Sequence, residues 1–287
     1  MDDALVRLAF AGLAPRRVDA IVARFGTVED AVSAIVSGCT SLDHAVVAEV
    51  SVSAATRRRQ LGAAGIEFMT RDQAAYPRRL AASAFAPRWL FAIGDPSIAR
   101  AATLAIVGTR TCTTYGRDLA FAYGVVAASM GWCVVSGLAK GIDGAAHEGA
   151  LSAGGRCVAV LGSGVDVVYP RRHRALYRSI TERDGAVVSE FPPMTPPHAW
   201  RFPTRNRIIA GMADVVLVVE ANASGGALIT AGLALDMGVP VFATPGDVDR
   251  PASIGTNLLI RDGAFPVFGD DDLAEVLDLI VPSLPIG

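Results

Sequence analysis

Glycine-rich turns that carry cationic side chains recur along this chain, and they suit the binding of phosphate groups. Gly108-Thr109-Arg110 follows one short apolar run, and the stretch SGLAKG (136–141) follows the next. Glycines and small hydroxyl residues ahead of a helix leave backbone N–H groups at the positive end of its dipole, where an anion binds. One such turn is ordinary in a parallel sheet, but several beside arginine and lysine favour a site for more than one phosphate.

The polar stretch FPTRNRIIAG stands directly before a hydrophobic segment and raises the question of what its arginines do. We expect Arg205, Asn206 and Arg207 to lie at the start of a helix at the ligand-facing edge of a sheet, where they clamp phosphates. In the alternative, Arg205 or Arg207 pairs with Asp214 or Glu190 and braces the fold. Substitution of Arg205 separates the two, because it changes either phosphate binding or the melting temperature.

The chain shows no persuasive pattern for catalysis. GSGVDV lacks the third glycine of the dinucleotide fingerprint, and neither a GxxxxGK[ST] loop nor a GxSxG elbow occurs. Asp143 and His147 are four residues apart on a predicted helix, which suits a capping carboxylate and a partly buried histidine better than an oriented imidazole. We therefore expect no catalytic residues and no cofactor.

A metal site is not expected either. The four cysteines lie too far apart in the sequence for a metal knuckle. Cys133 and Cys157 open apolar runs, where buried free thiols are expected.

From residue 103 onward, short apolar runs alternate with helical patterns, which predicts an α/β domain. The runs are LAIVG, CVVSG, CVAVLG, AVVSE, VVLVVEA, PVFATPG and PVF. Such runs with helices between them are typical of a parallel sheet covered on both faces. The expected fold is a doubly wound, mostly parallel, extended Rossmann-like sheet over residues 103–287, which binds ligands beyond the carboxyl ends of its strands.

The first part of the chain has a different character. Residues 1–65 are predicted to form a small helical domain, with Pro15 near a helix start and Gly26 and Gly38 as stops. Residues 66–102 are rich in turn residues and are expected to join the two parts. The proline-rich stretch at 191–203 is predicted to be an irregular loop at the carboxyl end of a strand.

Charge is unevenly distributed along the 287 residues, although the net charge is only −2. Residues 81–215 carry 14 basic and 9 acidic side chains, whereas residues 216–287 carry 2 and 10. A basic middle suits an anionic ligand, although solvated helix faces also carry such excesses. Lys140 is the one lysine in the sequence, and it lies in the second glycine-rich turn.

Hydropathy predicts a soluble protein. No run approaches the roughly 18 uninterrupted apolar residues of a membrane span, and the start of the chain lacks the basic region and cleavage site of a secretory signal. We therefore expect a reduced, cytoplasmic protein that does not engage a membrane.

Taken in order, these turns resemble the DNA-processing protein A (DprA/Smf) family. The matching segments are AIVGTR, SGLAKGIDGAAHEGAL, VLGSGVDVVYP, SEFPP, FPTRNRIIAG, VVEANASGGALITA, PVFATPG and SIGTNLLI. The resemblance covers about residues 65–284 and implies an extended Rossmann domain. Together with the glycine turns, it predicts phosphate contacts at Gly108, Thr109, Arg110, Ser136, Gly137, Lys140, Gly141, Gly162, Arg205, Asn206, Arg207, Ser224 and Gly225.

The resemblance also implies a function. The implied function is that of a non-enzymatic protein that binds single-stranded DNA without strong sequence preference. Such a protein protects incoming strands and helps to load the RecA recombinase during natural transformation or related recombination. A homodimer is expected. The N-terminal helices resemble a SAM or helix-hairpin-helix module. The C-terminal winged-helix domain of many members is not expected here, nor is duplex binding that depends on it.

Two other functions stay open. An enzyme of the related Rossmann group that acts on nucleoside monophosphates would have similar glycine turns, but SGGALIT departs from the PGGxGT pattern of such enzymes and offers no catalytic glutamate. A nucleotide sensor would use the same pocket for a short ligand. The dependence of binding on oligonucleotide length separates a sensor from a strand-binding protein.

Overall fold

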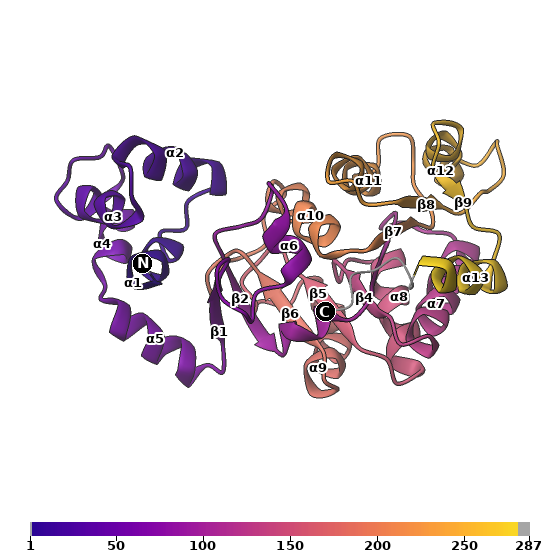
Figure 1. Ribbon diagram of the computed structural model, residues 1–287, viewed down its shortest axis with the longest axis horizontal. Helices are drawn as coiled ribbons and strands as arrows, with labels where there is room; N and C mark the ends of the chain where they lie inside the picture. The colour runs from indigo at the N-terminus through magenta and orange to yellow at the C-terminus, as the bar shows by residue number, and fades with distance from the viewer. Residues whose placement is uncertain (1, 281–287) are drawn as a thin grey trace.

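A computed structural model of the protein describes residues 2–280, which contain a nine-stranded mixed sheet with helices on both faces (Figure 1). The strand order is β1-β2-β6-β5-β4-β3-β7-β8-β9. β2 pairs antiparallel with β1 and with β6, and the strands from β6 to β9 pair in parallel. The predicted α/β class with a mostly parallel, Rossmann-like sheet is confirmed.

Each apolar run singled out in the sequence forms a strand of the parallel region. These strands are β3 (Thr103–Val107), β4 (Cys133–Ser136), β5 (Cys157–Val160), β6 (Ala186–Ser189), β7 (Val215–Val218), β8 (Val241–Ala243) and β9 (Phe265–Pro266). In β7, Val215 and Leu217 join the core on one face, while Val216 and Val218 join the core on the other. Because side chains alternate along a strand, burial on both faces requires an apolar residue at every position.

The helices that follow these strands form two layers. One face is covered by α7 (Thr114–Ser129), α8 (Ile142–Ser152), α9 (Arg174–Glu182) and α13 (Asp270–Ile280). The other is covered by α6 (Arg78–Ala82), α10 (Arg201–Met212), α11 (Gly226–Asp236) and α12 (Pro251–Arg261). Cys133 and Cys157 are buried free thiols, as predicted.

Helix α10 begins earlier than expected. Its first residue is Arg201, so the last three residues of the predicted loop are helical, and Arg205 to Arg207 lie in its second turn instead of at its start. Pro203 is compatible with this because a helix tolerates proline in the first turn, where the N–H group has no intrahelical acceptor.

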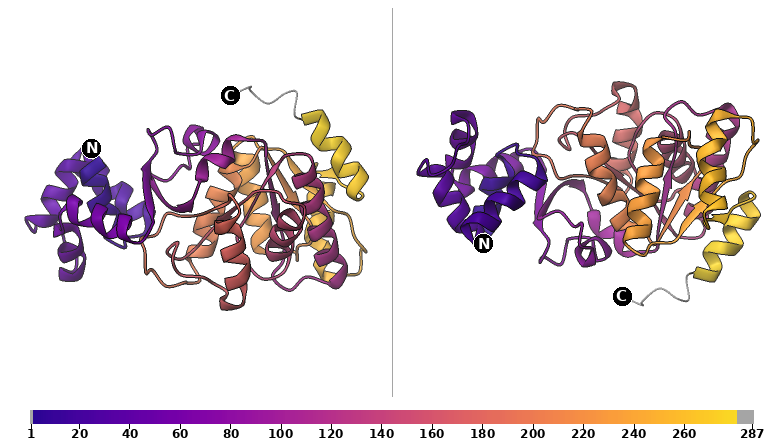
Figure 2. Two further views of the ribbon diagram at one scale, coloured as in Figure 1. Left: turned by 90° about the horizontal axis from the view of Figure 1, so that it is seen from below. Right: turned by 90° about the horizontal axis from the view of Figure 1, so that it is seen from above.

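The N-terminal helices lie at the β1 end of the sheet, away from β9 (Figures 1 and 2). They are α1 (Asp2–Ala9), α2 (Pro15–Phe25), α3 (Val28–Val36), α4 (His44–Ser51) and α5 (Ala54–Ala63). Pro15 opens α2, and Gly26 ends it with a φ of 90°. Phe10 packs edge-to-face on Phe91 of β2, with ring centres 5.7 Å apart, so the helical part and the sheet share apolar packing.

Residues 66–102, expected only to join the two parts, extend the sheet. They form β1 (Glu67–Thr70) and β2 (Trp89–Gly94), with α6 between them, and a 3₁₀ turn η1 (Pro96–Arg100) leads into β3. β2 pairs with β6 through Ala92 and Val188. Within residues 2–280, no helix has the length and apolar character needed to cross a membrane.

Candidate nucleic-acid interface

The turns after β3 and β4 and the first turns of α10 and α11 enclose a cavity of about 80 Å³ at the carboxyl edge of the sheet. β4, β5 and β6 lie on one side of β3 and β7 and β8 on the other, which is the arrangement that opens a ligand crevice in doubly wound sheets. Gly108, Arg110, Arg205 and Asn206 line the cavity, together with Asp143. Residues predicted from separate turns are therefore brought together at one place.

Arg110 and Lys140 present unpaired positive charge at this edge. Both are exposed, and within residues 2–280 no carboxylate oxygen lies within 4.0 Å of a side-chain nitrogen atom of either residue. Neither residue forms an ion pair with a described acid, so their charge is available to an anionic ligand.

An aromatic surface adjoins Arg110. The guanidinium carbon of Arg110 lies 4.7 Å from the centre of the Phe202 ring, and the Tyr169 ring lies 5.5 Å from that of Phe202. Tyr169 is 44% exposed, which leaves ring surface open to solvent. Exposed rings beside unpaired cations can stack with nucleobases while the cations contact the backbone. Neither ring was predicted from the sequence to belong to the site, although each stands within a few residues of an arginine-containing turn.

Arg171, Arg172 and Arg174 extend the cationic surface from the 3₁₀ turn η2 (Arg171–His173) into α9. All three are exposed. His173 fixes this segment to the turn after β4, because its Nδ1 atom lies 3.0 Å from the Leu138 carbonyl oxygen.

Arg205 lies inside the protein beneath this surface. It is only 3% exposed, and its guanidinium donates hydrogen bonds to the carbonyl oxygens of Gly137, at 2.9 Å, and Val160. Its Nε donates to Asn206 at 3.0 Å. Burial lowers the pKa of Arg205 to about 10, which leaves the group charged at neutral pH. The phosphate contact of Arg205 stays a prediction, and these bonds give the side chain a structural task at the ends of β4 and β5.

The turn that carries Lys140 is held by buried groups. The Asp143 carboxylate accepts hydrogen bonds from the backbone N–H of Gly137 at 3.1 Å and of Ala139 at 3.4 Å. Gly137 faces the Arg205 guanidinium so closely that a Cβ atom would collide with it, and Gly141 has a φ of 78°. Both positions therefore require glycine. Burial raises the pKa of Asp143, against the opposing effect of Arg205.

His147 lies four residues after Asp143, and it is fully buried rather than partly buried as expected. Neither ring nitrogen has a hydrogen-bond partner among the described residues. Burial lowers its pKa to about 3, so the imidazole is neutral at physiological pH. Asp143 caps a turn and does not orient His147, which agrees with the capping interpretation of this pair.

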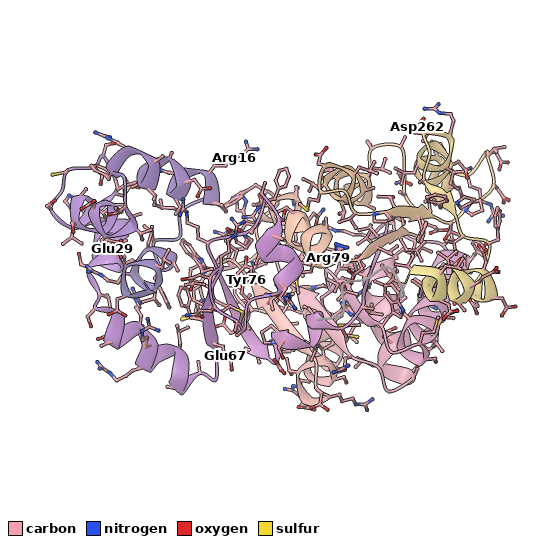
Figure 3. All side chains as sticks on the ribbon, viewed as in Figure 1. Arg16, Glu29, Glu67, Tyr76, Arg79 and Asp262 are labelled. Atoms are coloured by element: carbon pink, nitrogen blue, oxygen red, sulfur yellow. The ribbon has the colours of Figure 1, made fainter. Side chains whose placement is uncertain are left out.

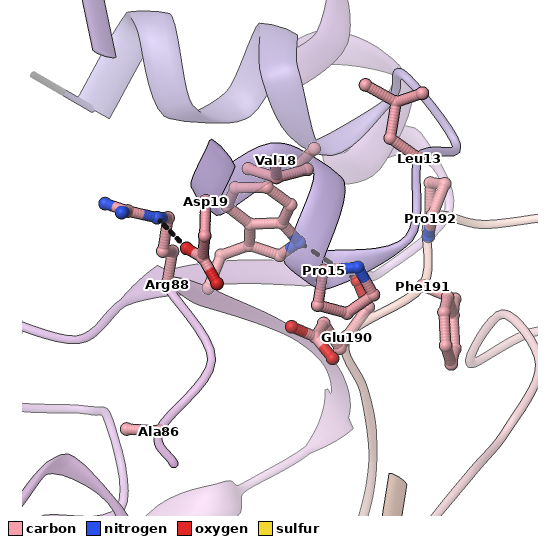
Figure 4. Close-up of a pocket in the computed structure, with 11 residues that line it drawn as sticks. Leu13, Pro15, Val18, Asp19, Ala86, Arg88, Glu190, Phe191 and Pro192 are labelled. Carbon is pink, nitrogen blue, oxygen red and sulfur yellow. Dashed lines mark hydrogen bonds and ion pairs between the residues drawn. The ribbon is translucent and has the colours of Figure 1, made fainter. Parts of the chain in front are cut away.

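Arg207 is directed away from the cavity and does not line it. It donates to both carboxylate oxygens of Glu190 at 2.7 Å, and the two side chains are 15% and 7% exposed. Glu190 lies beneath Pro15 of the helical part (Figure 4). Burial raises the pKa of Glu190, while Arg207 opposes the rise. This is the bracing ion pair that the sequence offered as the alternative. Asp214 pairs instead with Arg79, at 2.7 Å. Arg79 lies on α6 (Figure 3).

The other residues predicted from the sequence lie around the cavity and support it. The Thr109 N–H donates to the Glu220 carbonyl oxygen at 2.8 Å, and the buried Ser136 hydroxyl donates to the Ile106 carbonyl oxygen at 2.6 Å. A Cβ atom at Gly162 would press on the Phe202 ring, so this glycine makes room for it. Ser224 and Gly225 form the turn ahead of α11, which Asn206 reaches through a 3.3 Å bond from Nδ2 to the Gly226 carbonyl oxygen.

Comparison with known proteins gives one family for most of the chain. Residues 67–278 match the model of the family described as DNA recombination-mediator protein A. The Smf protein of Escherichia coli K12 is 42% identical over 214 residues, which are 75% of this chain and 57% of that protein. The DNA processing protein DprA of Streptococcus pneumoniae is 42% identical over 205 residues, 70% of this chain and 71% of that protein. The match thus spans little more than half of the E. coli relative.

Solved structures agree with these matches. The crystal structure of DNA processing protein A from Streptococcus pneumoniae superposes with a TM-score of 0.79 at 31% identity, and the match covers 99% of this chain and 98% of that one. A structure of DNA processing protein A from Helicobacter pylori, which concerns its single-stranded DNA binding mode, gives a TM-score of 0.64 at 26% identity. That match covers 74% of this chain and 95% of the other.

Proposed function

The chain belongs to the DNA recombination-mediator protein A family, and from this premise we propose that it binds single-stranded DNA at the carboxyl edge of its sheet. The observation that carries the proposal is the stack of Arg110 on Phe202, whose ring also contacts Tyr169, beside the glycine turns. A cationic and aromatic surface of this kind suits a strand whose bases are unpaired, because each base offers a face for stacking.

The side chains divide into two roles in this proposal. Arg110, Lys140 and the arginines at 171, 172 and 174 contact backbone phosphates, since they are exposed and unpaired. Gly108 and Ser224 contribute backbone N–H groups ahead of helices, whereas the N–H groups of Thr109 and Gly225 already donate to the carbonyl oxygens of Glu220 and Asn222. Arg205 and Arg207 act from within, Arg205 by holding the Lys140 turn and Arg207 by bracing α10 against Glu190. Phe202 and Tyr169 stack with bases.

The role in the cell follows from the family. We propose that the protein covers single strands during recombination, including that of incoming DNA in transformation, and helps RecA to assemble on them. The Helicobacter pylori protein, whose single-stranded DNA binding mode has been examined, supports the first part. We propose no catalytic step, because His147 is buried and neutral and Asp143 caps a turn. The RecA part is tested by whether the protein speeds RecA-dependent strand exchange on a coated strand.

A homodimer through the β9 end of the sheet completes the proposal. β9 forms one edge of the sheet, and Phe265 and Phe268 beside it are 64% and 73% exposed. Unpaired edges and exposed aromatic groups favour association.

Competition binding tests the proposed strand specificity. A labelled oligo-dT strand is titrated with protein by fluorescence anisotropy and then competed with deoxynucleoside monophosphate, duplex DNA and unlabelled oligo-dT. We expect only the unlabelled strand to compete well. Equal competition by the mononucleotide would replace this function by that of a nucleotide sensor or enzyme, because a pocket for one nucleotide does not gain from length.

A further inference from the structure

A second cavity, of about 670 Å³, lies between the helical part and the proline-rich loop. We call it the interdomain groove. One wall comes from the end of α1, from α4 and from α5, and includes Phe10, Val46 and Leu61. The opposite wall comes from residues 192–196 and Arg201. A volume of this size is within the range of small-molecule sites, whereas the cavity at the sheet edge is far smaller.

Arg201 places a stacked guanidinium in this groove. Its guanidinium carbon lies 5.1 Å from the ring centres of both Phe191 and Trp200, and Nη1 donates to the Pro196 carbonyl oxygen. Its Nε is buried without a hydrogen-bond partner among the described residues. No carboxylate within residues 2–280 lies within 4.0 Å of it. A guanidinium that stacks on rings and has no carboxylate partner leaves its positive charge available to a ligand in the groove.

The opposite wall, from the helical part, also has an arginine stacked on an aromatic ring. The Arg57 guanidinium carbon lies 4.2 Å from the centre of the Phe10 ring, Arg57 is 6% exposed, and its Nε also lacks a partner. Glu49 pairs with Arg57, and Asp166 accepts the Met194 N–H at 2.8 Å. The charges that line the groove therefore balance, which suits one flat ring with acceptor edges better than a row of phosphates.

The groove is continuous with the candidate interface through Trp200-Arg201-Phe202. Phe202 lies against Arg110 at the sheet edge, and Arg201, its neighbour, lines the groove. Between them is the N-terminus of α10, a 12-residue helix with no side-chain cap. The positive end of its dipole adds a second reason for an anionic link to cross this point.

We propose that the interdomain groove binds a further nucleotide of the same single strand, next to the one that stacks on Phe202. The base lies among Phe10, Val46 and Leu61, beside the ring-stacked guanidinium groups of Arg57 and Arg201, and its phosphate crosses the N-terminus of α10. This inference rests on the proposed function and gives the helical part a role in it. An apolar peptide in the same groove would make no use of the two stacked guanidinium groups or of the helix N-terminus.

Two neighbouring alanines provide a matched test. Ala64 lines the groove, whereas Ala63 is equally exposed but does not line it. Ala64→Glu brings a carboxylate to the path of the strand, and Ala63→Glu adds the same charge at the same helix end. Met194→Glu repeats the change from the opposite wall, where Met194 is 82% exposed. All three substitutions are at exposed positions, and circular dichroism verifies that each variant is folded.

Each variant is titrated in full-length form against oligo-dT of about 4 to about 20 nucleotides. We expect Ala64→Glu and Met194→Glu to bind the longest strand at least about fivefold more weakly than Ala63→Glu. A fivefold change in Kd corresponds to about 1 kcal/mol, the low end of the range for the loss of one stacked base. We expect all variants to bind the shortest strand alike. Equal binding of long strands by all variants, with wild-type binding intact, overturns the groove but not the proposed function. Absence of strand binding by the wild type overturns the proposed function itself.

Discussion

Substitution of Arg205 distinguishes a buried positioning residue from an exposed phosphate clamp. Arg205→Met keeps much of the side-chain volume but removes the donor from the Gly137 and Val160 carbonyl oxygens. Each buried polar group that loses its partner costs roughly 1–3 kcal/mol. The two together predict a fall in the free energy of unfolding of about 2–6 kcal/mol. The buried Asp143 carboxylate also loses its nearby positive charge.

Urea unfolding followed by circular dichroism measures this loss, with Lys140→Met as the matched control. Lys140 is exposed, so its substitution is expected to change the unfolding free energy by less than about 0.5 kcal/mol while weakening strand binding. Arg205→Met is expected to lower stability and, through the loosened turn, to weaken binding in the folded protein as well. A variant as stable as the wild type that has lost strand binding would refute the positioning role and restore the phosphate clamp.

Four further substitutions probe separate parts of the molecule. Arg207→Met leaves the Glu190 carboxylate buried and unpaired, so we expect the unfolding free energy in urea to fall by about 3–5 kcal/mol. The pKa of His147 is lowered to about 3, so protonation favours the unfolded chain, and lowering the pH from 7.5 to 5.5 should cost about 1.4 kcal/mol of stability. Urea unfolding at pH 7.5 and at pH 5.5 measures this loss, and His147→Leu should make the difference in unfolding free energy between the two pH values smaller by about 1.4 kcal/mol. The same difference in the wild type and in His147→Leu would contradict the buried neutral state. Phe202→Ala should weaken oligo-dT binding by about 1–3 kcal/mol in anisotropy titrations while leaving the salt dependence unaltered. Phe268→Glu should shift the light-scattering mass toward that of a monomer, whereas an unchanged mass would exclude the β9 edge as the dimer surface.

The sequence predicted the parallel strands and their turns because each depends on local patterns. A strand buried on both faces must be apolar throughout, and β7 shows this at every position. The turns were visible because Gly137 and Gly141 are required by close approach and by positive φ. Their meeting at one edge then follows from parallel pairing.

The burial of Arg205 could not be predicted in the same way. Its acceptors are the carbonyl oxygens of Gly137 and Val160, which are distant from Arg205 in the sequence. Because every residue has a backbone carbonyl group, the residue types at these positions do not reveal the acceptors. The stack of Tyr169 on Phe202 likewise depends on how two loops meet. β1 and β2 were missed because they lie among turn residues and pair antiparallel at one end of the sheet.

The salt dependence of oligo-dT binding tests the central claim most directly. The double variant Arg110→Gln/Lys140→Gln is compared with the wild type and with Arg156→Gln, an exposed arginine that precedes β5 at the opposite edge of the sheet. We predict that the double variant binds more weakly and that its slope of log K against log salt is shallower by about 1.4, the value for two phosphate contacts with a single strand. Arg156→Gln should behave as the wild type does. If the double variant keeps the wild-type slope, the strand does not bind at the carboxyl edge of the sheet.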